Sequence, residues 1–97
     1  MRTHPNRENI YYHELIGLKI RILQYPDEKV VGLEGIVVDE TLKILVIEKA
    51  DKSVIKVFKA NGIFEFTLPN GEKVIIKGID MIGRPWDRLK KLLMVKR

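Results

Sequence analysis

Apolar and polar residues alternate with a period of two along most of this chain, which is the pattern of half-buried strands. Leu18, Ile20 and Ile22 alternate with charged neighbours and form the first such run. Residues 44–47 are apolar at four successive positions, which predicts a central strand covered on both faces. The predicted strands are residues 18–23, 35–38, 44–47, 54–58, 64–68 and 73–77.

Short turn signals separate these runs. Residues 26–29, 60–62 and 68–71 hold Pro, Asn, Asp or Gly in the positions that turns prefer. Such short connections favour an antiparallel barrel or sandwich over a βαβ sheet, and a barrel also removes exposed strand edges. The residues expected to fill its interior are Leu18, Ile20, Ile22, Ile36, Val38, Leu45, Ile47, Phe64, Phe66, Val74 and Ile76.

The N-terminal end carries a weaker helical signal. Residues 1–9 are polar and contain Pro5, which predicts a flexible arm, and residues 10–97 are expected to form a single domain. Residues 10–17 predict a short helix that ends at Gly17.

The C-terminal end predicts a cationic helix. Gly78 and Gly83 bracket a possible last short strand at residues 79–82. Pro85 then suits the first turn of an amphipathic helix over residues 85–94. Its apolar stripe is Trp86, Leu89, Leu92 and Leu93. Trp86 is expected to cover the end of the barrel.

Charge is unevenly distributed over the 97 residues. Residues 1–80 carry 12 Lys or Arg and 12 Asp or Glu, which cancel, whereas residues 81–97 carry six Lys or Arg and one Asp. The net charge of +5 therefore belongs to the C-terminal tail, and it favours an anionic partner. The absence of cysteine excludes disulfides and thiolate chemistry. No apolar run approaches the ~20 residues of a membrane helix, so we expect a cytoplasmic protein with no membrane partner.

Candidate catalytic groups are few. His4 and His13 both lie in the N-terminal segment, and the adjacent carboxylates of Asp39 and Glu40 have the character of turn residues whose side chains point apart. There is no phosphate-binding glycine loop, serine elbow or metal-ligand cluster. We therefore expect no catalytic residue, no metal site and no cofactor on this chain.

Binding to RNA is the function that the charge pattern favours. Outward lysines and arginines on the strands could join the cationic tail in one basic surface. About five phosphate contacts would give a slope of log affinity against log salt of roughly −3 to −5. For any single strand lysine, a solvated surface position is the simpler interpretation, but the clustering in the tail is harder to explain that way.

Five sequence blocks occur in an order that is specific to one family. They are residues 13–18, 35–41, 63–69, 71–74 and 82–85. Together they resemble archaeal ribonuclease P protein component 1, the counterpart of a eukaryotic RNase P/MRP subunit. Trp86 departs from this pattern, because a polar residue is expected after Gly83-Arg84-Pro85.

The resemblance implies a six-stranded antiparallel Sm-like/SH3-like barrel with short terminal helices. It implies a non-catalytic RNA-binding subunit of ribonuclease P, which removes the 5′ leader of precursor tRNA. In that family the RNA subunit, with bound magnesium, performs the hydrolysis. The partners it implies are RNase P RNA, a zinc-ribbon RNase P protein subunit, other RNase P proteins and, indirectly, precursor tRNA.

The resemblance also suggests contact residues. The family motif carries an RNA-contact role to Arg84, Arg88, Lys90 and Lys91. Geometry alone adds Lys19, Arg21, Lys73 and Lys77. Tyr11, Tyr12, Ile36 and Val38 are the candidates for binding the zinc-ribbon subunit. The alternatives are an Sm- or SH3-like protein-interaction adaptor with an incidental basic tail, and a small hydrolase that cleaves precursor tRNA by itself.

Overall fold

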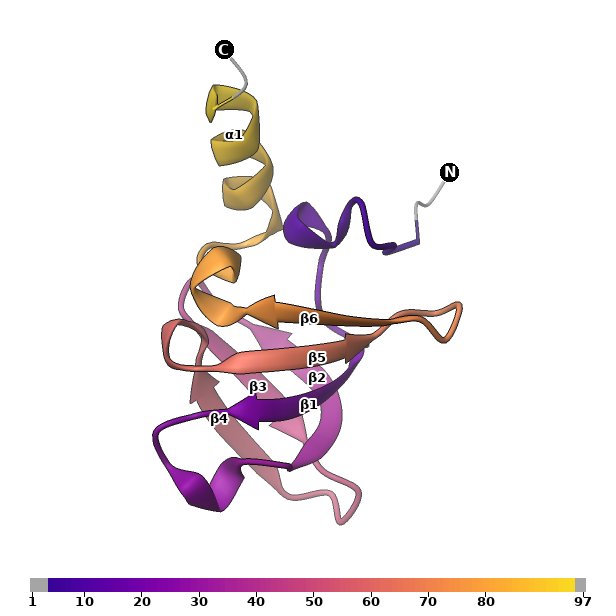
Figure 1. The fold of residues 1–97 in the computed structure, drawn as a ribbon, viewed down its shortest axis with the longest axis vertical. Coiled ribbons are helices and arrows are strands. Elements are labelled where there is room, and N and C mark those ends of the chain that lie inside the picture. Colours follow the sequence, from indigo (N-terminus) through magenta and orange to yellow (C-terminus); the bar gives the residue numbers. More distant parts are fainter. Residues whose placement is uncertain (1–3, 96–97) are drawn as a thin grey trace.

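Six antiparallel strands form one sheet in the computed structural model, which describes residues 4–95 (Figure 1). The strands are β1 (Lys19–Gln24), β2 (Glu34–Glu40), β3 (Ile44–Glu48), β4 (Val54–Phe58), β5 (Ile63–Thr67) and β6 (Lys73–Lys77). The 3-10 helices are η1 (Ile10–Tyr12), η2 (Glu28–Val30), η3 (Lys59–Asn61) and η4 (Gly78–Met81), and the α-helix is α1 (Pro85–Val95). The predicted all-β class and its six strands are confirmed.

The predicted closure into a barrel is not shown. The strand order is β4-β3-β2-β1-β5-β6, so β4 and β6 form the two edges of the sheet in the described part of the chain. The turns that follow these edges nevertheless meet, because η3 contacts η4 and Gly78 N–H donates to Gly62 O at 2.8 Å. A Cβ on Gly78 would lie 1.7 Å from Lys59 O, so only glycine permits this approach.

The core follows the predicted alternation on four strands, β1, β3, β5 and β6. Phe64, Phe66, Ile20, Leu45 and Ile76 are all buried. β3 is internal to the sheet, as predicted, but its second face is only half-buried. Further buried residues are Leu18, Ile22, Val37, Ile47, Val57, Leu68, Val74, Met81, Ile10 and Leu15.

The prediction for β2 is wrong by one residue. Val37 is buried, whereas Ile36 and Val38 are 40% and 41% exposed. The cause is Gly35, which shares a strand face with Val37: a Cβ there would lie 2.4 Å from the backbone oxygen of Glu48. A register shift between Val37 and Asp39 in the pairing with β3 further breaks the period of two.

Two short elements also differ from prediction. The helix expected at residues 10–17 is reduced to the single 3-10 turn η1, because the carbonyls of Tyr11 and His13 accept hydrogen bonds from Arg88 instead. Residues 79–81 belong to η4 and Ile82 is its C-cap, so no strand forms here.

Helix α1 forms where the sequence predicts it, but Trp86 does not pack as predicted. It projects beyond η4, with η1 beside its base (Figure 1). Trp86 is 63% exposed and Leu93 is 55% exposed, so Trp86 does not cover the end of the sheet. No helix within residues 4–95 is long and apolar enough to cross a membrane.

The N-terminal segment is described from His4 onward, and residues 1–3 of the predicted arm lie outside the described residues. Arg7 forms an ion pair with Glu72 at 2.6 Å. Asn9 is buried, and its side-chain oxygen accepts from the backbone N–H of Asn6 at 2.7 Å.

Candidate nucleic-acid interface

Three cations of the tail are exposed on or beside α1. They are Arg84, Lys90 and Lys91. The helix starts where it does because Gly83 has a φ of +101°, which favours glycine, and because Asp87 accepts a hydrogen bond from the Arg84 N–H at 3.1 Å. Lys96 and Arg97 lie outside the described residues.

Arg88 does not belong with these exposed cations, which corrects its assignment as an RNA contact. Its side chain is 3% exposed, and its guanidinium is occupied by internal acceptors. Nε donates to Tyr11 O at 2.6 Å, and Nη2 donates to His13 O at 2.7 Å. Nη1 donates to Glu40 Oε2 at 2.5 Å and also to Gly83 O.

Glu40 is the centre of a buried charge cluster, defined here as Glu40, Lys59 and Arg88. The side chains of Lys59 and Glu40 are 0% and 1% exposed, and Lys59 Nζ donates to Glu40 Oε2 at 2.8 Å. Lys59 Nζ also donates to Thr41 O at 2.8 Å and to Gly83 O at 2.9 Å. The other carboxylate oxygen, Oε1, accepts from Leu15 N–H at 3.3 Å.

The buried charge cluster holds two cations against one anion. Burial lowers the pKa of Lys59 below its ordinary value of 10.5, while the hydrogen bond to Glu40 and the charge of that carboxylate oppose this shift. The remaining positive charge is compensated by backbone carbonyls. No buried side-chain nitrogen or oxygen in the described chain lacks a hydrogen-bond partner.

The buried charge cluster was missed from the sequence because each member has an ordinary local explanation. Glu40 lies after the register shift in β2, so alternation from the buried Val37 would place its side chain outward, whereas it is buried. Lys59 does continue an inward series, since it lies two residues after the buried Val57. A lysine that continues the inward series just past the end of β4 is therefore the one available signal, because a buried cation requires a partner.

The strand cations predicted from geometry do share one face. Lys19 and Arg21 on β1 alternate with buried residues and therefore point outward, as do Lys73 and Lys77 on the edge strand β6. Strand β5 lies between them: Thr67 pairs with both Lys19 and Lys73. The outer face of β1, β5 and β6 is called the strand face below.

Carboxylates reduce the positive charge of the strand face. Arg21 pairs across the sheet with Glu34 on one side and Glu65 on the other. Lys19 lies 4.0 Å from Glu34 in an exposed ion pair. The cations on β6 have no cross-strand carboxylate among the described residues, so this edge is the more basic part of the face.

The candidates for partner binding lie on two surfaces. Tyr11 is exposed and Tyr12 half-buried in η1, whereas Ile36 and Val38 point outward from β2. Ile16, also exposed, lies between the two groups in the chain, and the neighbouring Gly17 N–H donates to Val37 O at 2.7 Å.

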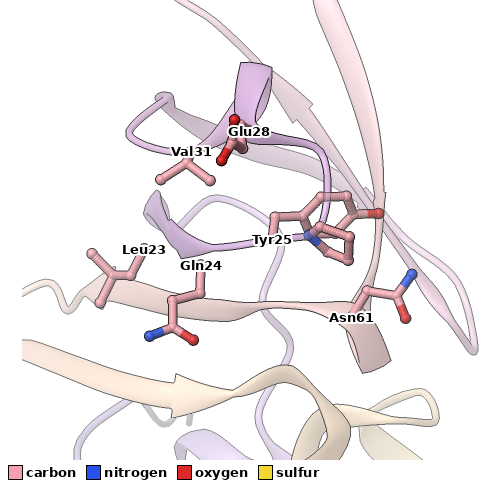
Figure 2. A pocket seen from close by; sticks show the side chains of 7 residues that line it. Leu23, Gln24, Tyr25, Glu28, Val31 and Asn61 are labelled. Atoms are coloured by element: carbon pink, nitrogen blue, oxygen red, sulfur yellow. The ribbon is translucent and has the colours of Figure 1, made fainter.

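A hollow in the described surface lies away from these residues. It measures about 650 Å³ and occupies the end of the molecule opposite α1, beside η2. Figure 2 shows Tyr25 between Gln24 and Asn61, and none of the lining residues is basic. Within residues 4–95 there is also no cluster of His, Asp or Glu that could hold a metal ion.

Comparisons with known proteins agree on one family. The family described as ribonuclease P/MRP, subunit p29 matches residues 8–91. Ribonuclease P protein component 1 of Desulfurococcus amylolyticus is 65% identical over 88% of this chain and 92% of its own length. The protein of the same description from Staphylothermus marinus is 58% identical over 90% of this chain and 95% of its own.

A solved structure shows the same relationship. A homologue of human RNase P protein Rpp29 superposes with a TM-score of 0.58 and 43% sequence identity, covering 78% of this chain and 97% of the other. In sequence and in fold, this chain is thus similar to protein components of ribonuclease P. This chain belongs to the ribonuclease P/MRP subunit p29 family, and its role is accordingly in ribonuclease P and tRNA processing.

Proposed function

We propose that this chain is a non-catalytic RNA-binding subunit of ribonuclease P. The observation that carries the proposal is the location of charge. The net +5 arises in the tail, where Lys90 and Lys91 are exposed on the projecting helix α1 and Arg84 is exposed just before it. Helical cations held at a fixed spacing can contact successive phosphates of an RNA backbone. The strand face adds weaker phosphate contacts, chiefly from Lys73 and Lys77 on β6.

The non-catalytic part of the proposal is supported by how the titratable groups are used. Glu40, the buried carboxylate of the described chain, accepts hydrogen bonds from Lys59, Arg88 and the Leu15 backbone, and so is occupied. In this proposal the hydrolysis of precursor tRNA belongs to the RNA subunit and its magnesium ions. The protein binds and stabilises that RNA in the cytoplasm.

We further propose that the sheet serves as an Sm-like barrel. Its support is the contact between η3 and η4, which brings the chain after β4 against the chain after β6 without a ladder between the two strands. A rigid, nearly closed scaffold of this kind holds the strand face and α1 in a fixed relation.

A protein partner is proposed on the apolar surfaces that the fold leaves exposed. Ile36 and Val38 on β2, with Tyr11 and Tyr12 in η1, fit a zinc-ribbon RNase P subunit that covers apolar residues. Trp86 and Leu93 on α1 are further apolar residues open to a partner, and they favour the adaptor interpretation as a second candidate.

Binding measurements separate the two candidates. The RNA-subunit proposal predicts that the purified protein retains RNase P RNA in the presence of an equal mass of heparin and prefers it to an unrelated structured RNA of the same length. An adaptor with an incidental basic tail would show no preference among these polyanions. Cleavage of precursor tRNA by the protein alone would contradict the non-catalytic assignment.

A further inference from the structure

None of the apolar side chains of α1 whose burial the structure describes is fully buried. Trp86 and Leu93 are exposed, and Leu89 is only half-buried. The helix has 11 residues, and isolated helices shorter than about 12–15 residues are marginal in water. A fixed direction of so short a helix therefore depends on specific contacts at its base.

Arg88 supplies those contacts. Its guanidinium joins α1 to η1 through Tyr11 O and to His13, the residue after η1, through the His13 carbonyl. It also donates to Met81 O at the end of η4, at 3.2 Å. A planar guanidinium with donors in a fixed fork can satisfy these acceptors in only one orientation. Arg88 thus connects α1 both to the N-terminal segment around η1 and to η4.

Glu40 and Lys59 hold that guanidinium in place. Glu40 Oε2 lies between Arg88 and Lys59 and accepts from both, and Gly83 O likewise accepts from both cations. Without the carboxylate, two buried cations would share one carbonyl and repel each other. The orientation of Arg88 therefore depends on the charge of Glu40.

We propose that the buried charge cluster is a positioning device: it fixes the direction of α1, so that RNA affinity depends on Glu40 although Glu40 contacts no RNA. This inference rests on the proposed RNA-binding role of Arg84, Lys90 and Lys91. Those three cations can meet phosphates together only when the helix that carries them keeps one orientation.

For Glu40→Gln, the inference predicts a change in RNA affinity opposite to the one expected from net charge alone. Glu40→Gln removes a negative charge, and a general gain of positive charge strengthens binding to RNA. Loss of helix direction instead weakens it, by about tenfold if one charge-assisted contact is lost. Asp80→Asn is the matched control, because Asp80 is exposed in η4 and its substitution makes the same change in net charge.

The experiment compares the full-length chain with Glu40→Gln and Asp80→Asn, under conditions where circular dichroism shows each to be folded. Affinity for RNase P RNA is measured together with hydrogen exchange of the α1 amides and the anisotropy decay of Trp86, the single tryptophan. We expect Glu40→Gln to weaken binding, speed exchange in α1 and increase the local motion of Trp86. We expect Asp80→Asn to bind as well as wild type or slightly better.

A second variant covers the case in which Glu40→Gln does not fold. Arg88→Lys keeps the net charge but loses the planar fork, so it should weaken RNA binding and loosen α1 without any change in charge. Unchanged or tighter RNA binding by Glu40→Gln or by Arg88→Lys would overturn the inference, whether or not hydrogen exchange in α1 changes. If wild type shows no selective RNA binding, the proposed function fails, and the α1 measurements alone then decide whether the cluster positions the helix.

Discussion

The members of the buried charge cluster should differ sharply in their contribution to stability. Glu40→Gln leaves two buried cations, Lys59 and Arg88, without their shared anion. Breaking a buried ion pair in this way typically costs about 3–5 kcal/mol, a large part of the 5–15 kcal/mol that stabilises a domain. We therefore expect Glu40→Gln to be among the most destabilising single substitutions outside the apolar core.

Lys59→Met should cost much less. It leaves Glu40 and Arg88 as a pair with one charge of each sign, and Gly83 O keeps Arg88 as a donor. Thr41 O loses the donor at 2.8 Å, a cost of about 1–3 kcal/mol, but the desolvation of a buried ammonium is removed at the same time. The net destabilisation should be about 1–2 kcal/mol.

Guanidinium-induced unfolding followed by far-ultraviolet circular dichroism measures both changes. Arg88→Met should lie between the two, since it leaves the Glu40–Lys59 pair intact but strands the carbonyls of Tyr11 and His13. A Lys59→Met variant that is destabilised as much as Glu40→Gln would refute the assignment of Glu40 as the centre of the cluster.

Three further predictions follow from the geometry. Burial lowers the pKa of Lys59 in the folded chain, so the unfolded chain binds more protons between that lowered pKa and 10.5. The stability of wild type relative to Lys59→Met should therefore rise from pH 7 to pH 10. A fall in this relative stability would contradict the prediction. Val37→Ala should cost about 2 kcal/mol in unfolding experiments, whereas Val38→Ala should stay within about 0.5 kcal/mol, and the reverse order would restore the simple alternation on β2. Gly78→Ala should destabilise by more than about 4 kcal/mol, because a Cβ on Gly78 would overlap Lys59 O. Gly71→Ala should cost only about 1–2 kcal/mol, because its Cβ would meet no other atom and only the positive φ is unfavourable. Equal melting temperatures of the two variants would disprove this.

The sequence predicts the elements of this fold well where the signal is local. Turn residues and alternation place all six strands within two residues of their ends, and Pro85 places the start of α1. The outward direction of Lys19, Arg21, Lys73 and Lys77 follows from the same alternation. These features depend only on the neighbouring residues in the chain.

Features that depend on distant contacts could not be predicted in this way. Gly35 takes an inward position because Glu48 and Ile47 leave no room for a side chain, and this reverses the faces of Ile36 and Val38. Arg88 has the same local pattern as its exposed neighbours, yet three of its acceptors lie 48, 75 and 77 positions away in the chain. Amphipathic spacing predicted a packed Trp86, but the described chain provides no surface to bury it.

The central claim is that exposed tail cations hold RNA phosphates, and it is tested most directly by salt dependence. Truncation at Arg84 would also remove Arg88 from the buried charge cluster, so the sharper variant is Arg84→Gln/Lys90→Gln/Lys91→Gln. Lys29→Gln/Lys49→Gln/Lys52→Gln gives the same change in net charge in η2 and in the connection between β3 and β4, and is the matched control.

The measurement is the affinity of wild type and both triple variants for RNase P RNA across a salt series. If each tail cation contacts one phosphate, the slope of log affinity against log salt should become less negative by roughly 2–3 in the tail variant, with weaker binding throughout. The control should keep the wild-type slope. A tail variant that binds with unchanged affinity and unchanged slope would contradict the central claim.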